Sequence, residues 1–120
     1  MPESAKHPEP ATTPEDLGRL FVARANAGDV DGLLALYEPD AVLATPAGPA
    51  TGTQAIRAAF TALLADRPTF TPGEPRPTLR AGDLALTSTR LDGGGLTVEV
   101  ARRRRDGTWR WVIDQPRAAG

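Results

Sequence analysis

The sequence predicts an α+β fold in which three amino-terminal helices pack on one face of a mostly antiparallel sheet. Two observations predict it. Apolar residues recur at the helical spacing of three and four in the first half of the chain, and they alternate with a period of two in the second half. The dipeptide Asp106-Gly107, between the last two alternating segments, is typical of a tight hairpin turn. At 120 residues the chain fits one domain of this kind.

Each predicted helix has a start signal in the sequence. Thr13 is expected to cap the first helix, with Pro14 and two acidic residues in its first turn. Asp29 is expected to cap a second, shorter helix that closes with Tyr37. A third helix begins at Thr53 and stops before the next proline.

The remaining predicted elements are strands and turns. A short apolar strand at residues 41–44 precedes a loop rich in proline and glycine at residues 45–52. Residues 69–79 are interrupted by prolines, which confines a strand there to the edge of a sheet. Three longer strands are predicted at residues 83–91, 96–105 and 108–114. They follow one another through short turns, so we expect an antiparallel meander.

The predicted domain organisation is a single folded unit at residues 14–117. Residues 1–13 hold three prolines and several charges without apolar periodicity, so they are expected to form a flexible tail. Residues 118–120 form a second, short tail. The single histidine, His7, lies in the first tail, so it is not expected to act as a ligand or a base.

Composition excludes several classes of function. The chain has no cysteine and one histidine, so we expect no thiolate nucleophile, no metal and no cofactor. The formal net charge is −1, and the four arginines at 102–105 would alternate between two faces of a strand, which does not suit a nucleic-acid surface. No apolar run approaches the ~20 residues of a membrane span. The first ten residues lack the apolar core of a secretory signal, so we expect a cytoplasmic protein.

Four short stretches carry a resemblance to a known family. They read ANAGDVDGL at 25–33, LYEPDAV at 36–42, GTQAIR at 52–57 and DGTWR at 106–110. In this order and spacing they resemble the SnoaL-like and ketosteroid-isomerase-like proteins of the nuclear transport factor two-like superfamily, over about residues 14–116. The resemblance implies a curved sheet wrapped around the helices. It thus implies a cone-shaped α+β barrel with an internal, mostly apolar pocket for a small apolar molecule, and a homodimer formed through the outer sheet face.

The resemblance does not extend to the catalytic groups of the steroid isomerases. Those enzymes use an Asp base, a helix-one Tyr and a protonated Asp on a later strand. The corresponding positions here fall near Thr45, on Phe21 and near Ala101. None of these side chains can act as a carboxylate base or donate a hydrogen bond as a carboxylic acid does. The isomerase mechanism in its known form is therefore not expected.

Asp114 is the candidate catalytic residue. The resemblance places an acid or base on the last strand of SnoaL-like cyclases, and burial inside the pocket would suit a carboxyl group to proton transfer. A second interpretation stays open. Trp109, Trp111 and Ile113 alternate as an apolar face, which would leave Asp114 on the opposite face beside Arg110, solvated or ion-paired.

Five further side chains are candidates for substrate binding. They are Tyr37, Arg90, Glu99, Arg110 and Trp111. Glu99 shares a strand face with Thr97 and Ala101, and it could form a cross-strand ion pair with Arg90 or Arg110 or bind a polar group of the substrate. Tyr37 could donate its hydroxyl to a ligand or to a partner in the core.

Two functional hypotheses follow. The first is a cofactor-independent isomerase, cyclase or hydrolase that works by proton transfer on a small, largely apolar molecule. The alternative is a non-catalytic ligand-binding or dimerisation module with a degenerate active site. The sequence leaves the choice between enzyme and binding module open.

Overall fold

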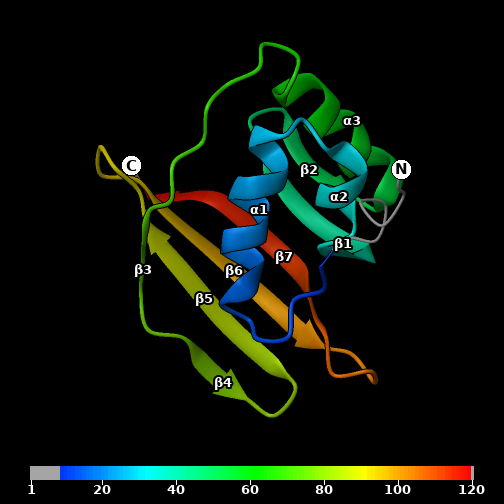
Figure 1. The fold of residues 1–120 in the computed structure, drawn as a ribbon, viewed down its shortest axis with the longest axis vertical. Helices are drawn as coiled ribbons and strands as arrows, with labels where there is room; N and C mark the ends of the chain where they lie inside the picture. The colour runs from blue at the N-terminus through cyan, green and yellow to red at the C-terminus, as the bar shows by residue number, and fades with distance from the viewer. Residues whose placement is uncertain (1–8, 120) are drawn as a thin grey trace.

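The computed structural model describes residues 9–119 and contains three helices and seven strands (Figure 1). The helices are α1 (Asp16–Asn26), α2 (Val30–Leu34) and α3 (Thr53–Leu63). The first strands are β1 (Tyr37–Thr45), β2 (Gly48–Thr51), β3 (Glu74–Pro75) and β4 (Leu79–Ala81). The last three are β5 (Leu84–Arg90), β6 (Leu96–Arg103) and β7 (Trp109–Ala119).

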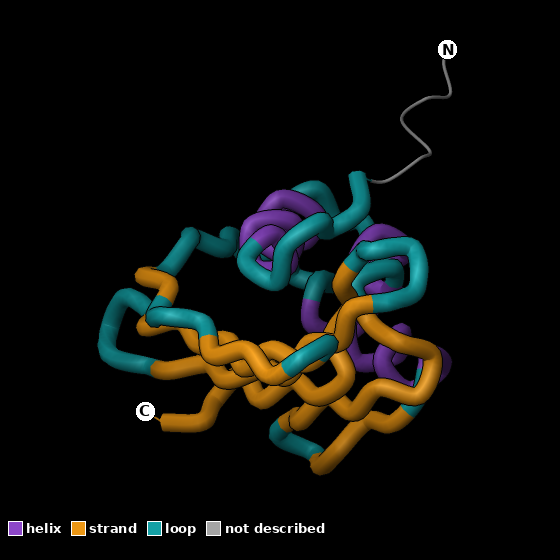
Figure 2. Tube along the Cα trace, turned by 90° about the horizontal axis from the view of Figure 1, so that it is seen from below, coloured by secondary structure: helices purple, strands orange, loops and turns teal. Residues whose placement is uncertain are grey.

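The strands form one curved, mixed sheet in the order β2-β1-β7-β6-β5-β3, with β4 also paired to β5. Neighbouring strands are antiparallel except β1 and β7, which are parallel. Figure 2 shows the helices and their connecting loops on one side of the curved sheet. The predicted α+β class, with three helices on a curved sheet, is confirmed. The sheet is open and does not close into a barrel, because β2 and β3 lie at its two ends.

Side-chain hydrogen bonds lie at the first two predicted helix starts, whereas α3 begins at Thr53 as predicted but has no side-chain cap. Thr13 and Asp16 form a reciprocal cap: Thr13 Oγ1 accepts from the Asp16 amide at 3.2 Å, and Asp16 Oδ2 accepts from the Thr13 amide at 3.2 Å. Regular α-helical structure begins at Asp16, after one tighter turn. At α2, Asp29 Oδ1 accepts from the Gly32 amide at 2.9 Å.

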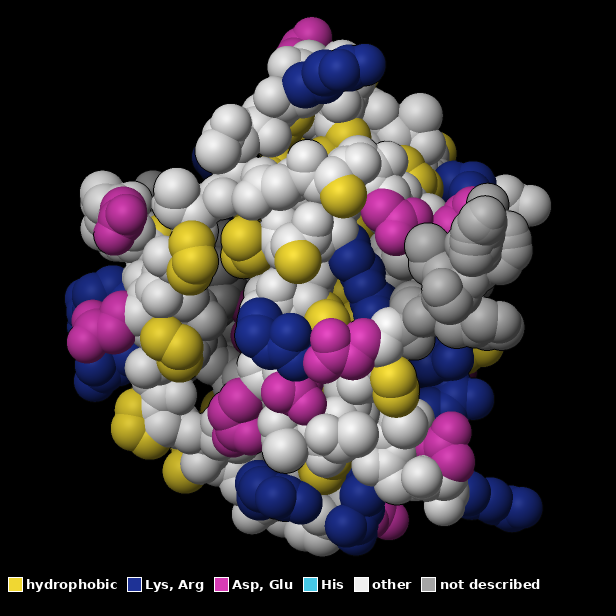
Figure 3. Space-filling view, viewed as in Figure 1, with side chains coloured by type: hydrophobic (Ala, Val, Ile, Leu, Met, Phe, Trp, Pro, Cys, Tyr) yellow, Lys and Arg dark blue, Asp and Glu magenta, His cyan; other side chains and the backbone are white. Residues whose placement is uncertain are grey.

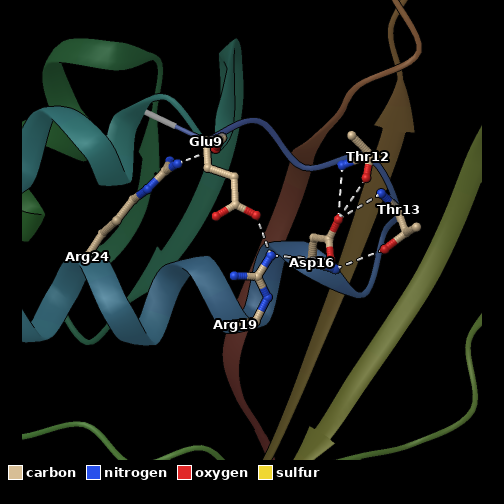
Figure 4. A network of polar contacts seen from close by, with 6 residues as sticks. All are labelled: Glu9, Thr12, Thr13, Asp16, Arg19 and Arg24. Atoms are coloured by element: carbon tan, nitrogen blue, oxygen red, sulfur yellow. Dashed lines mark hydrogen bonds and ion pairs between the residues drawn. The ribbon is translucent and has the colours of Figure 1, made fainter. Parts of the chain in front are cut away.

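Residues 9–13 of the predicted tail lie against the folded domain. Ala11 is buried, and its carbonyl accepts from the amide of Trp109 on β7 at 2.9 Å. Arg24 of α1 donates to the carbonyl of Glu9, and Arg19 forms an ion pair with the Glu9 carboxylate at 2.6 Å (Figure 4). The packed structure therefore begins before residue 14. His7 lies outside the described residues.

The second helix is shorter than predicted, and Tyr37 belongs to a strand. α2 ends at Leu34, and the Trp111 amide donates to the Leu36 carbonyl at 2.7 Å. This contact draws the chain alongside β7, and Pro39 is incompatible with a continuing helix. Tyr37 consequently pairs with Trp111 across β1 and β7.

Two other predicted segments also differ. The predicted loop at residues 45–52 holds β2, which forms a hairpin with β1 after a turn in which Thr45 Oγ1 donates to the Gly48 carbonyl at 2.6 Å. The edge strand predicted at 69–79 is reduced to the short β3 and the start of β4, because the prolines of this segment interrupt the pairing. Both short strands pair with β5.

A β-bulge at Val112 reverses the facing of β7. Trp111 pairs with Ala101 and Ile113 pairs with Val100, so two neighbouring residues of β6 meet three residues of β7. Trp111 is buried on the inner face, Ile113 is 50% exposed on the outer face, and Asp114 returns to the inner face. The expectation that Ile113 shares a face with Trp109 and Trp111 is therefore wrong, because it assumed unbroken alternation.

The core lies between the helices and the inner face of the sheet. Its fully buried side chains include Leu17, Leu33 and Ile56, and Phe60 and Trp111 are also buried. None of the helices in residues 9–119 has the length and apolar character needed to cross a membrane.

Candidate functional site

A cavity of about 500 Å³ lies between α1, the segment at residues 70–78 and the inner face of the sheet. Figure 3 shows the hollow beside α1, between this helix and the segment that leads to β3. Its apolar lining includes Pro14, Phe21, Val22, Phe70, Pro72 and Trp111. Its polar lining from the sheet includes Thr87, Ser88, Thr97, Glu99 and Asp114. The volume suits a small organic molecule.

Asp114 is the ionisable group with the most perturbed environment in the cavity. Its side chain is 6% exposed, and burial raises its pKa from 3.8 to about 7, with a smaller contribution from the nearby charge of Glu99. The hydroxyl of Tyr37 donates to Asp114 Oδ2 at 2.5 Å and opposes this rise. A carboxyl group with a pKa near neutrality can both give and take a proton.

Glu99 lies next to Asp114 on the neighbouring strand. The two residues are directly paired in the register of β6 and β7, and both are less than a tenth exposed. Thr87 of β5 donates its hydroxyl to Glu99 Oε1 at 2.7 Å. Burial raises the pKa of Glu99, and its hydrogen bonds with threonines partly oppose the effect. The cavity wall thus carries two adjacent buried carboxyl groups.

Tyr37, predicted as a substrate-binding residue, is not among the residues that line the cavity, and its hydroxyl serves instead as a buried hydrogen-bond donor to Asp114. It is 3% exposed, and burial together with the adjacent Asp114 charge raises its pKa well above the usual value for a tyrosine. Its ring packs against Trp111, with the centroids 5.2 Å apart, and against Phe60 at 5.6 Å. These contacts hold the hydroxyl in place, and it stays protonated at neutral pH.

Trp111 presents an indole N–H without a partner among the described residues. The side chain is 4% exposed and lines the cavity, and its Nε1 atom is buried. A buried donor without an acceptor costs about 1–3 kcal/mol. Phe21 lies 6.0 Å from the Trp111 ring and 5.8 Å from Phe70, so three aromatic rings form one wall of the cavity.

Arg90 and Arg110, predicted as substrate-binding residues, are not among the residues that line this cavity. Arg90 is exposed and pairs with Leu96, whereas Glu99 pairs with Thr87, which lies three positions before Arg90 on β5. Arg110 pairs with Arg102 and borders a separate hollow of about 140 Å³. The suggested Glu99–arginine ion pair is therefore not formed in the described structure, because the strand register separates these side chains.

The three positions that correspond to the catalytic groups of the steroid isomerases carry no acidic side chain. Phe21 lines the cavity and Ala101 is buried on the inner sheet face, whereas Thr45 hydrogen-bonds within its own turn. No group of three or more potential metal ligands lies together in residues 9–119. The polar groups that the cavity lining does supply include the carboxyl pair, Glu99 and Asp114.

The segment that closes one side of the cavity was not singled out from the sequence. Asn26, the last residue of α1, fixes it: its Nδ2 donates to the Phe70 carbonyl at 2.9 Å, and its Oδ1 accepts from the Phe70 amide at 2.7 Å. Phe70 also packs edge-on against Phe21. A lone aromatic residue between Pro68 and Pro72 was the only available signal in the sequence.

The arginine run at the end of β6 is engaged on two sides of the sheet. Arg102 lies 3.6 Å from a carboxylate oxygen of Glu38, and Arg103 lies 2.6 Å from one of Asp83. Arg103 also lies over the ring of Trp109, 5.9 Å from its centroid. The predicted alternation holds for Arg102 and Arg103, whereas β6 ends at Arg103, so Arg104 and Arg105 lie beyond the strand that was predicted to reach residue 105.

Replacing Tyr37 by Phe is expected to raise the pKa of Asp114 further. The variant removes the hydroxyl that stabilises the Asp114 carboxylate and keeps the ring packing. Removal of one such hydrogen bond shifts a pKa by about one unit. Carboxyl ¹³C NMR titration of wild type and Tyr37→Phe measures the change. An unchanged or lower Asp114 pKa in the variant would contradict the assigned hydrogen bond.

The comparisons with known proteins agree with this architecture. A model of the SnoaL-like domain matches residues 19–118. A Thiobacillus denitrificans protein, provisionally named a calcium/calmodulin-dependent protein kinase type II association domain, is 24% identical with a TM-score of 0.73 over 89% of this chain and 96% of that one. A ketosteroid isomerase-like protein from Erwinia carotovora atroseptica is 17% identical with a TM-score of 0.66, over 83% and 88% of the two chains. An NTF2-like protein of unknown function from Pseudomonas putida is 21% identical with a TM-score of 0.64, over 83% and 80%. Similarity at these identities shows a shared fold.

Proposed function

The chain belongs to the SnoaL-like domain family, and we propose that, within this fold, it is a cofactor-independent enzyme that moves a proton on a small, largely apolar molecule. One observation carries the proposal. Asp114 is a buried carboxyl group that lines a cavity of about 500 Å³ and has its pKa raised to about 7. Perturbed carboxyl groups in clefts are typical of general acids and bases.

The proposed reaction is a proton shift within the substrate. The Asp114 carboxylate accepts a proton from a carbon of the bound molecule, and the electron pair of that C–H bond moves into the substrate. The resulting carboxylic acid then returns the proton to another atom of the same molecule. The substrate and product are isomers, so the step balances without an oxidant, reductant or second substrate.

The neighbouring groups have distinct proposed roles. Tyr37 holds Asp114 in position through its 2.5 Å hydrogen bond and tunes its acidity. Trp111, whose Nε1 lacks a partner among residues 9–119, is proposed to donate to an acceptor atom of the ligand. Phe21 and Phe70 provide the apolar surface for the body of the ligand. Arg90 and Arg110 do not line the cavity and have no role in this proposal.

A hydrogen–deuterium exchange screen tests the proposal. A library of small apolar amines, ketones and esters is incubated with the protein in D₂O, and loss of carbon-bound proton signals is followed by ¹H NMR. We expect wild type to exchange at least one member of the library and Asp114→Asn to slow that exchange by about 100-fold or more. The amide is close in size to the carboxyl group and cannot accept the proton.

The matched control is Asp106→Asn, the same chemical change at an exposed turn outside the cavity lining. It is expected to exchange at the wild-type rate. Exchange that survives in Asp114→Asn, or a library that wild type leaves untouched, would count against proton transfer and in favour of a binding module.

A second candidate function, homodimerisation, is favoured by the outer face of the sheet. Five apolar side chains lie in direct register across it, one from each of five strands. They are Leu79 (β4), Leu86 (β5), Val100 (β6), Ile113 (β7) and Val42 (β1), here called the outer stripe. Leu79 is 66% exposed, Ile113 50% and Leu86 40%. A contiguous exposed apolar patch of this kind suits a partner surface, and a second copy of the chain supplies a self-complementary one. The cytoplasmic location predicted from the sequence is kept as part of this proposal.

A further inference from the structure

The cavity holds two buried carboxyl groups, and none of the residues that line it within residues 9–119 is a buried basic one. Glu99 and Asp114 are paired across β6 and β7, and each is less than a tenth exposed. Among the ion pairs of residues 9–119, none involves either carboxyl group. Their hydrogen bonds come from neutral hydroxyl groups, those of Tyr37 and Thr87. Negative charge developed here is therefore uncompensated by the protein.

The other charged groups along the cavity lie at its rim. Arg19 and Arg76 are exposed, and Arg19 is already paired with Glu9 at 2.6 Å. Glu15 is a third exposed group at the rim. These side chains face water, which screens them strongly, so they contribute little at the depth of the carboxyl pair.

Three aromatic rings lie on the same cavity. Phe21 lines it together with Phe70 and Trp111, with ring centroids 5.8 and 6.0 Å from that of Phe21. Aromatic faces attract cations electrostatically as well as burying apolar surface. This observation is independent of the carboxyl pair, and both indicate the same kind of ligand.

We infer that the ligand of this cavity is a small apolar cation, such as a protonated or quaternary amine, with its charge beside Glu99 and Asp114 and its apolar body against the aromatic rings. The inference rests on the proposed function, because it names the substrate class of the same cavity. A cationic ligand supplies the positive charge that the cavity lining does not place beside Glu99 and Asp114. It also explains why two carboxyl groups are kept side by side in an interior lined by phenylalanine and proline.

A matched pair of probes tests the charge directly. Phenyltrimethylammonium and tert-butylbenzene have the same shape and differ in the charged nitrogen. Binding is followed by ¹H–¹⁵N NMR shifts of the Trp111 indole and the Asp114 amide at pH 8. We expect the cation to bind at least about tenfold more tightly than the neutral probe. Because the quaternary nitrogen does not titrate, its affinity should rise as the pH rises through about 7, where Asp114 ionises.

Glu99→Gln and Asp114→Asn are expected to weaken phenyltrimethylammonium by about tenfold each and to leave tert-butylbenzene within twofold. Gln retains an oxygen for the Thr87 hydroxyl, so the strand pairing is preserved. Asp106→Asn removes an exposed charge outside the cavity lining and is expected to leave both affinities unchanged. Far-ultraviolet circular dichroism of each variant checks that the fold is intact.

Any of three results would overturn the inference, and two of them concern the matched probes and the variants. One is binding of the neutral probe as tight as that of the cation, and the other is undiminished cation binding in both carboxyl variants. Absence of any shift with the cation would overturn it as well. The exchange assay on Asp114→Asn decides the proposed function separately, since proton transfer on a neutral substrate would survive the failure of the cation.

Discussion

Raising the pH from about 4 to about 8 is expected to lower the free energy of unfolding by about 4 kcal/mol through Asp114 alone. The reason is the change of its pKa from 3.8 to about 7 on burial. Between these values the folded protein holds a proton that the unfolded chain has released. Stability from this group is therefore complete at the acidic end and is lost as the pH rises through about 7. Glu99, whose pKa is also raised by burial, acts in the same direction.

Urea denaturation of wild type and Asp114→Asn across this pH range, at one protein concentration, measures the effect. The amide is neutral at every pH, and it can still accept the Tyr37 hydroxyl. As the pH rises from about 4 to about 8, the difference in unfolding free energy between Asp114→Asn and wild type should shift by about 4 kcal/mol in favour of the variant. A change of that size also moves the midpoint of thermal unfolding by more than about 10 °C.

Asp106→Asn provides a control of opposite sign. Hydrogen bonds from the Thr108 side chain and backbone lower the pKa of Asp106, an exposed carboxylate. Replacing the Asp106 carboxylate should slightly lower the free energy of unfolding at high pH and leave it unchanged at low pH. Profiles of wild type and Asp114→Asn that run parallel across the range would show that Asp114 ionises in the folded protein as it does in water.

A positive charge on the outer stripe is expected to dissociate the proposed dimer. In a two-fold interface, Ile113→Arg places two buried charges close together, one from each copy. A like-charge contact of this kind costs several kcal/mol, so the dissociation constant should rise by about 100-fold or more. Ile113 is 50% exposed in the single chain, so the substitution leaves its core intact.

Sedimentation equilibrium of wild type, Ile113→Arg and Ala58→Arg tests the outer stripe. Ala58 is exposed on α3, away from the outer face of the sheet, so its arginine variant should associate as wild type does. Association of Ile113→Arg as strong as that of wild type would place the interface elsewhere. Loss of association in Ala58→Arg as well would show that the effect is not specific to the outer stripe, and a wild type that is monomeric at all concentrations would remove the dimer proposal.

The sequence was sufficient for the parts of the fold that depend on local signals. Thr13 and Asp29 mark two helix starts because capping involves only the next few residues, and α3 begins at Thr53 as predicted, without a side-chain cap. The turn at Asp106-Gly107 separates β6 from β7 for the same reason. Tyr37 was misplaced because its strand forms through a distant partner, the Trp111 amide bonded to Leu36.

The candidate site was harder to predict, because its membership depends on strand register. Asp114, Glu99, Tyr37 and Trp111 were identified by residue type. In the structure Asp114, Glu99 and Trp111 line the cavity, and Tyr37 lies beside them, bonded to Asp114. Arg90 was also predicted as a binding residue from its residue type, but the register of β5 on β6 places it away from Glu99. The aromatic side chain of Phe70 reaches the cavity through a long irregular segment whose path no local pattern specifies.

The bulge at Val112 has a consequence for how such cavities change over time. In an alternating strand, one extra residue acts as a phase shift, so every later side chain exchanges the interior for the exterior. The spacing between Trp111 and Asp114, rather than the identity of either, decides whether the cavity receives a carboxyl group or the apolar side chain of Ile113. A single-residue insertion or deletion in β7 can therefore replace an ionisable side chain in the cavity by an apolar one, even though no side chain on the strand is itself substituted.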